Sequence, residues 1–114
     1  MKSDLIFPYE RVDDLQLGGI KIIQNPDWFC FGTDAVILAD YAVPSIKKNA
    51  KVLDLCSGNG IIPLLLSQKC DAHKIWGIEI QECVAEMAKR SIKLNNLEDK
   101  IEMLCEDLKN AENV

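Results

Sequence analysis

The sequence is poor in metal-binding residues. His73 is its one histidine, and no two of its five cysteines are separated by only two residues. Zinc sites need closely spaced ligands and disulfide frameworks need paired cysteines, so neither is indicated. We expect no metal site, and we expect reduced thiols, as is usual in a cytoplasmic protein. The cysteines are Cys30, Cys56, Cys70, Cys83 and Cys105.

The chain also has little basic charge and no long apolar run. Lysine and arginine number 13 against 18 acidic residues, and the net charge is −5. A protein that binds nucleic acid on its own needs a basic face for the phosphates, so this chain is a poor stand-alone RNA binder. Its apolar stretches are shorter than a membrane span, and its first residues, MKSDLIFPYE, lack the apolar centre of a secretion signal. These features favour the cytoplasm and predict no contact with a membrane.

What the sequence does contain is a regular alternation of strands and helices. Strands are predicted at residues 51–55, 75–80 and 101–105, and helices at 61–69 and 81–95. This order is typical of parallel strands with right-handed crossovers, and therefore of an α/β, Rossmann-like fold with a three-layer arrangement. The first strand is a nearly continuous apolar run, which is expected when both faces of a sheet are covered.

The residues before this alternation have a different pattern. Residues 19–24 (GIKIIQ) are predicted to form a short strand, and the following Asn-Pro-Asp is a turn signal. A helix begins near Thr33, with Gly32 or Thr33 as its cap, and Pro44 ends it. We divide the chain into an N-terminal extension with short strands, residues 1–32, and the first half of a Rossmann-like domain, residues 33–114.

The alternation supplies only three parallel strands. In a doubly wound sheet the first strand lies centrally, and a further strand returns along its other side. No further strand is predicted after residues 101–105, so one edge of residues 51–55 has no predicted partner. An unpaired edge on so apolar a strand favours aggregation. We therefore expect that the chain is the first half of a longer protein, truncated after the third core strand, or that it self-associates through this edge.

A glycine loop, VLDLCSGNGI at residues 52–61, follows the first of these strands. A dinucleotide-binding loop needs the pattern G-x-G-x-x-G, but Pro63 stands where the third glycine should be. Asp54, just ahead of the loop, would repel a pyrophosphate and attract a cationic ligand. S-adenosylmethionine is such a ligand, because it carries an ammonium and a sulfonium but no phosphate. We expect it to be the cofactor, although a glycine loop alone often only turns the chain.

Acidic residues follow the ends of all three strands. Asp54 and Glu79 close the first two, and Asp107 comes just after the third. The carboxyl ends of parallel strands share the sheet edge at which open α/β sheets bind ligands. Glu79 would accept hydrogen bonds from both ribose hydroxyls, and Asp107 from the adenine amino group. Singly, Glu79 is also explained as a solvated strand end and Asp107 as a turn residue, but the three in order indicate a cofactor site.

Several segments together resemble one family of class I S-adenosylmethionine-dependent methyltransferases. They are the leader YERVDDLQ, then IIQNPDWFCFGTDAVILADY, VLDLCSGNGIIPLLL, GIEIQ and AKRSIKLNNLEDKI, and they extend from about Tyr9 to Asp107. They are similar to the bacterial tRNA1(Val) adenine-37 N6-methyltransferases, which are also grouped as predicted O-methyltransferases. The glycine loop alone is widely shared, whereas its combination with QNPDWFCFGTDAV is far more specific.

The resemblance implies a set of cofactor contacts. The glycine loop would line the methionine end, with Cys56 where many relatives carry glycine. The segment before the loop would close over that end, although helix capping explains Thr33 and Asp34 equally well. Ile80 would lie against the adenine. The implied contacts are Asp54, Cys56, Ser57, Gly58, Asn59, Gly60, Glu79, Ile80, Asp107 and Leu108, together with Phe31, Thr33 and Asp34.

The resemblance also implies direct methyl transfer to N6 of an adenine in a tRNA anticodon loop, without a metal. The family's catalytic loop, N-P-P-Y, does not follow Asp107. Asn25 in NPDW imitates that loop, but Asp27 replaces the second proline, and the family places this segment in an N-terminal hairpin. We interpret Asn25 as a turn residue and expect no catalytic residue in the chain. The chain should hold cofactor-contacting groups yet fail to methylate, with tRNA bound mainly by the missing C-terminal half.

Two other functions stay open. The same fold serves methyltransferases that act on small molecules or proteins, because a fold does not determine a substrate. A non-catalytic module that binds an adenosyl ligand is the alternative from a different class. An N-P-P-Y motif in the residues after Val114 would support methylation of a base amine.

Overall fold

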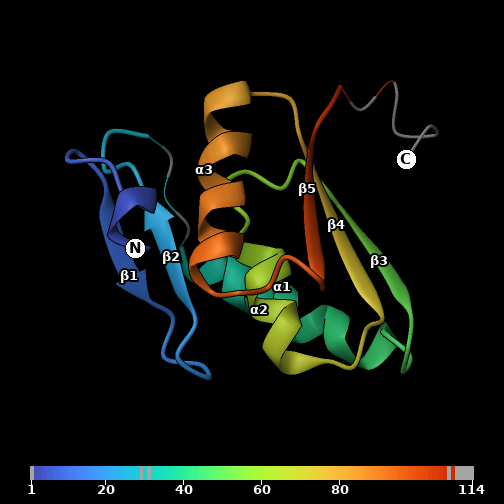
Figure 1. Ribbon diagram of the computed structural model, residues 1–114. Helices are drawn as coiled ribbons and strands as arrows, with labels where there is room; N and C mark the ends of the chain where they lie inside the picture. The colour runs from blue at the N-terminus through green and yellow to red at the C-terminus, as the bar shows by residue number, and fades with distance from the viewer. Residues whose placement is uncertain (1, 29, 31, 108, 110–114) are drawn as a thin grey trace.

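Two sheets lie on opposite sides of a helix layer in the computed structural model, which describes residues 2–28, 30, 32–107 and 109 (Figure 1). The larger sheet holds β3 (Lys51–Leu55), β4 (Lys74–Glu79) and β5 (Ile101–Cys105), in the order β3-β4-β5 with parallel pairing. Helices α2 (Ile61–Lys69) and α3 (Glu82–Leu94) form the crossovers. The predicted α/β fold with a parallel sheet is confirmed. The strand predicted at 75–80 lies one residue earlier at each end, and the helix predicted at 81–95 begins and ends one residue inside that range.

The inner face of this sheet forms the hydrophobic core with the helices. Ile75 and Ile101 point toward the helix layer and pack in one cluster with Leu64 of α2 and Ala88 of α3. Burial of such aliphatic side chains contributes about 1.5–3 kcal/mol each to folding. Ile20 and Ile22 of the N-terminal extension belong to the same cluster, so the extension shares its core with the helices.

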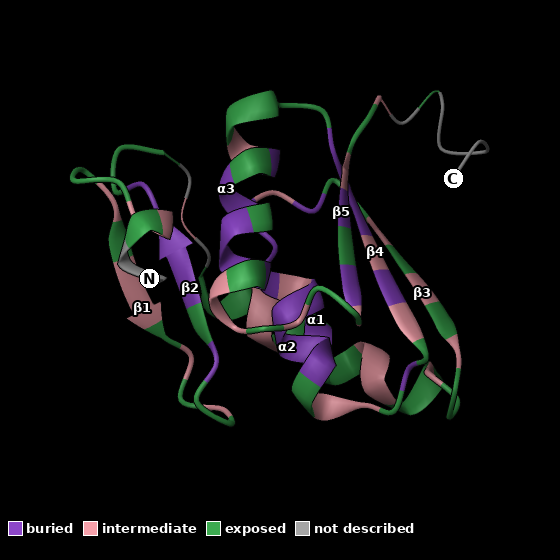
Figure 2. Cartoon of the chain, in the orientation of Figure 1, coloured by how far each residue is buried: buried purple, intermediate pink, exposed green. Residues whose placement is uncertain are grey.

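The outer face of the sheet is more open. Among the described residues all three α-helices lie on one side of the sheet, so no third layer covers the other side (Figures 1 and 2). Leu53 is 44% exposed and Leu55 is 51% exposed, although the apolar run of β3 predicts burial on both faces. The described residues therefore give β3 one strand neighbour, β4, and leave an apolar stripe beside it.

The N-terminal extension is a hairpin that packs against α3. A short 3-10 turn (Lys2–Leu5) precedes β1 (Arg11–Asp14) and β2 (Lys21–Gln24), which pair antiparallel. Polar side chains of α3 and of its C-cap residue, one helical turn apart, bond the free edge of β2. The Ser91 hydroxyl accepts from the Ile23 N–H at 2.9 Å, and the Asn95 amide both accepts from and donates to the Lys21 backbone. Strand β1, which the sequence shows only as a charged patch, is thereby held as the outer strand.

Arg90 of α3 binds the segment that precedes β1. Its guanidinium makes a bidentate ion pair with Glu10, whose side chain is 1% exposed, and also donates to the Leu5 carbonyl. The Phe7 ring lies 3.8 Å from the guanidinium carbon, a cation–π contact. Burial opposes the charged form of Glu10, but hydrogen bonds from Arg90 and from the Phe7 N–H outweigh it, so its pKa is lowered.

Helix α1 (Thr33–Ala42) links the hairpin to the sheet and packs against α2. Gly32 is its N-cap and Thr33 its first residue, so of the two predicted caps the structure uses the glycine. Pro44 lies in the 3-10 turn Val43–Ser45 that ends the helix, as predicted. No helix in the described part of the chain has the length and apolarity to cross a membrane.

Candidate functional site

The glycine loop after β3 is a tight bend in an unusual backbone conformation. Cys56, Gly58 and Gly60 all have positive φ angles, of 57°, 58° and 87°. The bend is closed by hydrogen bonds from the Ser57 N–H to the Ile78 carbonyl, at 2.7 Å, and from the Gly60 N–H to the Ser57 carbonyl, at 3.0 Å. Glycine adopts these angles freely, whereas the Cys56 side chain strains its backbone. Helix α2 begins directly after this bend.

The neighbouring strand makes room for the loop. A Cβ atom on Gly77 of β4 would lie 2.6 Å from the Ser57 Oγ and 2.9 Å from the Ser57 Cβ. Glycine at this position therefore lets the Ser57 side chain lie against the sheet. From there the Ser57 hydroxyl donates to the Asp54 carboxylate at 2.7 Å. Asp54 points to the helix side of the sheet, as the alternation along β3 requires.

Asp54 is a carboxylate that has lost much of its water. Burial raises its pKa, and the hydrogen bond from Ser57 only partly offsets that rise. No lysine or arginine in the described part of the chain forms an ion pair with it. A desolvated anion without a counter-ion gains from a cationic ligand, because the attraction is stronger there than in water.

Glu79 joins the glycine loop to the end of β4. One carboxylate oxygen accepts from the Gly58 N–H at 2.9 Å, and the other accepts from the Gln81 N–H at 3.0 Å. Glu79 is buried, and a carboxylate has about four acceptor positions, so two stay available for a ligand. The sequence places Glu79 at a strand end but gives no sign that it also holds the loop.

Two adjoining cavities lie at the carboxyl edge of the sheet. The larger encloses about 410 Å³ and the smaller about 250 Å³. Cys56 and Glu79 line both, so the cavities are neighbours on either side of these side chains. Asp54 lies in the larger cavity and Asp107 in the smaller. The three acids that follow successive strands therefore border two neighbouring cavities around the bend.

The structure brings most of the predicted site residues to these cavities. The larger is lined by the predicted residues Asp34, Asp54, Cys56, Ser57, Gly58, Asn59 and Glu79, and the smaller by Cys56, Glu79, Ile80 and Asp107. Gly60 and Thr33 line neither cavity, although their neighbours Ile61 and Gly32 line the larger one. Phe31 and Leu108 lie outside the described residues. Contact of any of them with a cofactor stays a prediction.

Other lining residues have no clear signal in the sequence. Trp28 and Leu38 line the larger cavity from the segment before α1 and from α1 itself, and Val84 and Met87 line it from α3. Leu38, Val84 and Met87 are typical of helix faces, and only the packing of α1 and α3 brings them to the cavity. Gln81 and Glu106 follow strand ends, a position that could have marked them.

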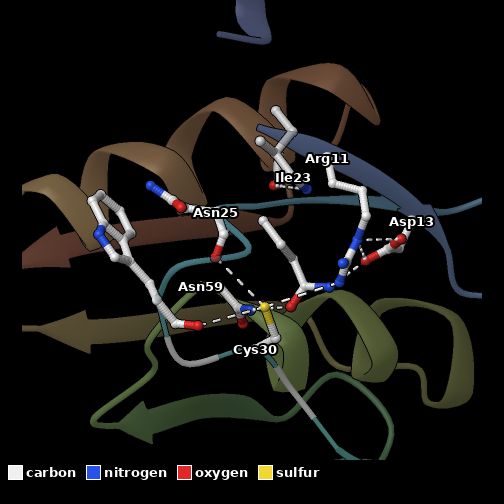
Figure 3. A network of polar contacts seen from close by, with 9 residues as sticks. Arg11, Asp13, Ile23, Asn25, Cys30 and Asn59 are labelled. Atoms are coloured by element: carbon white, nitrogen blue, oxygen red, sulfur yellow. Dashed lines mark hydrogen bonds and ion pairs between the residues drawn. The ribbon is translucent and has the colours of Figure 1, made fainter. Parts of the chain in front are cut away.

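Asn25 has a role in a turn. Its side-chain oxygen accepts from the Asp27 N–H at 2.9 Å, and its carbonyl accepts from the Trp28 N–H at 3.0 Å. It is not among the lining residues of the two cavities. The Cys30 thiol also donates to its carbonyl, and Arg11 reaches toward the same sulfur (Figure 3). The geometry agrees with the interpretation of Asn25 as a turn residue.

A parallel sheet with a glycine loop and acids at its carboxyl edge defines a Rossmann-like site, and comparison with known proteins narrows the class. In the complex of aTrm5 with tRNALeu, 89% of this chain matches 29% of the Trm5 chain with a TM-score of 0.72 and 23% identity. Methanocaldococcus jannaschii TYW2 with AdoMet matches 90% of this chain over 45% of its own, with a TM-score of 0.74 and 16% identity. The fold is thus that of the Rossmann-like methyltransferases.

Sequence comparison identifies the family. Residues 40–114 match the TRM5/TYW2 methyltransferase domain, and the chain belongs to this family. It is also 32% identical over 78 residues to a tRNA1(Val) (adenine(37)-N6)-methyltransferase of Bacteroides fragilis, in a match that covers 68% of this chain and 32% of the relative. The chain therefore spans about a third of the length of the curated relatives it matches.

Proposed function

We propose that the chain is the cofactor-binding part of an S-adenosylmethionine-dependent methyltransferase that acts on tRNA. The observation that carries the proposal is Asp54, a desolvated carboxylate in the larger cavity beside the glycine loop, without a cationic partner among the described residues. Membership of the TRM5/TYW2 family supports the reaction, and the similarity to Trm5, whose structure is a complex with tRNALeu, supports tRNA as the substrate.

The acids around the two cavities support a cationic cofactor there. Asp54 would hold the cationic methionine end, Glu79 the ribose hydroxyls, and Asp107 the adenine amino group, with Ile80 against the ring. The two cavities together are within the usual size range for small-molecule sites. Bound there, S-adenosylmethionine would supply a methyl group on a positively charged sulfur. The chain's own part is to bind, orient and desolvate, which suits a direct transfer.

We further propose N6 of adenine 37 as the acceptor. The support is the activity for which the Bacteroides fragilis relative is named and the sequence resemblance from the leader to Asp107. The target base would leave its stack to enter the site, as base-modifying enzymes require. A net charge of −5 on this chain implies that most phosphate-binding lysines and arginines lie elsewhere in the full protein, which acts in the cytoplasm.

The experiment has two stages. Calorimetry with S-adenosylhomocysteine tests the site, and a labelled-methyl assay of the full-length protein on bulk tRNA, followed by nucleoside analysis, tests the reaction. We expect binding and then N6-methyladenosine. Failure to bind would overturn the cofactor assignment. Binding without transfer would instead favour a ligand-binding module, and a methylated guanosine would overturn the acceptor alone.

The open edge of β3 supports a second, separate proposal about assembly. Leu53 and Leu55 border this edge and are about half exposed. We propose that further polypeptide covers them, either from the full-length protein or from a second copy. Sedimentation of the 114-residue chain and of the full-length protein distinguishes the two. Self-association of the short chain alone indicates that the full-length protein covers the edge itself, whereas dimers of both indicate a second copy.

A further inference from the structure

The glycine loop is bonded to the N-terminal hairpin by a buried pair of side-chain amides. Asn59, between the two glycines of the bend, donates from Nδ2 to the Gln24 Oε1 at 3.0 Å. Gln24 ends β2 and is 2% exposed, while Asn59 is 7% exposed. The two residues are 35 positions apart in the sequence. In water such a bond has little net value, but a buried amide left without its partner is costly.

Asn59 uses its other side-chain atom to start a helix. Its Oδ1 accepts from the Ile61 N–H at 3.2 Å, the first N–H of α2. One amide group therefore fixes the bend on both sides, toward the hairpin through nitrogen and toward α2 through oxygen. Because Asn59 also lines the larger cavity, its orientation sets the shape of the proposed cofactor site.

Gln24 is itself oriented from the hairpin. Its Nε2 donates to the Asp13 carboxylate of β1, and both Asp13 oxygens lie 2.9 Å from Arg11 Nε, which donates to them. Figure 3 shows the contact between Arg11 and Asp13. The direction of the hydrogen bonds from Asp13 through Gln24 to Asn59 is fixed, since the Asp13 carboxylate can only accept. Gln24 must therefore present its oxygen to Asn59.

The loop needs such external support. Three residues out of five, Cys56, Gly58 and Gly60, have positive φ angles, and a strained backbone persists only where its surroundings determine it. Glu79 holds one half of the bend through the Gly58 N–H. The Gln24–Asn59 bond holds the other half. The Glu79–Gly58 contact involves no residue of the hairpin, whereas the Gln24–Asn59 bond depends on the hairpin.

We infer that Gln24 is a positioning residue for the cofactor site, and that the hairpin sets the conformation of the glycine loop through Asn59. This inference rests on the proposed function, in that the site is taken to bind an adenosyl cofactor. Gln24 itself touches no cofactor. It acts through Asn59, and its removal loosens the bend and the start of α2.

The test compares Gln24→Leu with Gln68→Leu in the full chain. Gln68 is exposed on α2 and serves as the matched control. At a temperature well below unfolding, we expect the Kd for S-adenosylhomocysteine to rise about tenfold in Gln24→Leu and to stay unchanged in the control. A purely structural role would lower the melting temperature and leave the Kd as it is, which would overturn the inference.

A second measurement needs no ligand. Hydrogen exchange at the Ile61 amide should speed up in Gln24→Leu, because Asn59 is no longer held, and should not change in Gln68→Leu. Unchanged exchange at Ile61 overturns the inference even if the wild type fails to bind S-adenosylhomocysteine. That failure would count against the proposed function instead, so the two ideas fail separately.

Reversing the direction of the hydrogen bond between residues 13 and 24 should restore the affinity that a substitution of Gln24 removes. Gln24→Glu still offers an oxygen to Asn59 but places a second carboxylate against Asp13, so it should also weaken binding. Adding Asp13→Asn supplies an amide donor at position 13 and removes the repulsion. We expect the double variant to recover most of the affinity and of the Ile61 protection. A double variant that binds no more tightly than Gln24→Glu would contradict the proposed hydrogen bonds from Asp13 through Gln24 to Asn59.

Discussion

The glycine loop and the N-terminal hairpin lie against the same helix layer but are held in different ways. The loop is hydrogen-bonded to its own sheet, by Ser57 to Asp54 and by Gly58 to Glu79, between residues 3 and 21 positions apart in the sequence. The hairpin is fastened to α3 over 68 to 80 positions. Changes in the loop should therefore act first on ligand affinity, and changes in the hairpin anchors first on stability.

The strongest test of this difference is the hairpin anchor on α3. Arg90→Leu leaves Glu10 buried without its partner, and breaking a buried ion pair in this way costs about 3–5 kcal/mol. We expect that loss in urea unfolding. The exposed neighbour Lys89 gives the control, because Lys89→Leu should change the free energy of unfolding by less than about 0.5 kcal/mol.

Acid should reduce the effect of Arg90→Leu. The pKa of Glu10 is lowered in the folded protein, so its contribution to stability is present above the ordinary carboxyl pKa and is lost as the pH falls through the lowered value. The gap in unfolding free energy between wild type and variant should therefore narrow in acid. A gap that is independent of pH would mean that the Phe7 contact, rather than the ion pair, provides the anchor.

Asp54 provides the opposite case, a residue that should favour ligand binding at the expense of stability. Asp54→Asn removes the anion facing the methionine end, and loss of a charged hydrogen-bond partner should raise the Kd for S-adenosylmethionine about ten- to a hundredfold. Calorimetry measures this directly. Asp71→Asn, at an exposed position, is the control and should bind as the wild type does.

The same variant should gain stability without ligand. The pKa of Asp54 is raised by burial, so its contribution to stability is present below the ordinary aspartate pKa and is lost as the pH rises through the raised value. Asp54→Asn should unfold at a higher urea concentration than wild type at neutral pH, and at a similar concentration in acid, below the ordinary aspartate pKa. In the wild type, affinity should fall as acid protonates Asp54. A variant less stable at every pH would show that the carboxylate is structural.

A methyl group on Gly77 would crowd the loop from the sheet side. Ser57 is a short side chain and cannot move aside without its backbone, so Gly77→Ala should cost about 1–3 kcal/mol through overpacking. It should also weaken binding, because Ser57 then leaves Asp54. Unfolding and calorimetry on one preparation test both effects. Loss of stability with full affinity would show that Met103, whose flexible end lies 2.7 Å from the added atom, yields instead.

The difference between the two regions also explains what could be predicted. Strand β3, helix α2 and strand β5 have the predicted bounds, because apolar runs and the glycine bend are local signals. Asp54 and Glu79 are found from their places at strand ends. The N-terminal hairpin is expected only from the family resemblance. The Arg90 ion pair and the Gln24–Asn59 bond could not be predicted, since each joins residues 35 or more positions apart.

The smallest effect is expected at Cys56, where the loop is strained by its own side chain. A φ of 57° costs a residue with a Cβ about 1–2 kcal/mol, and Cys56→Gly removes this cost. Glycine also raises the conformational entropy of the unfolded chain, which lowers the stability of the folded protein by about 0.4–1 kcal/mol. We expect a net gain of about 0.5–1 kcal/mol in urea unfolding, with affinity for S-adenosylhomocysteine retained. Gly58→Ala is the mirror control, because a Cβ there meets no atom within 4 Å yet must adopt a φ of 58°. The stability lost by Gly58→Ala should therefore come from backbone strain alone. If Cys56→Gly destabilises the protein while Gly58→Ala does not, contacts of the Cys56 side chain determine the bend instead of backbone strain.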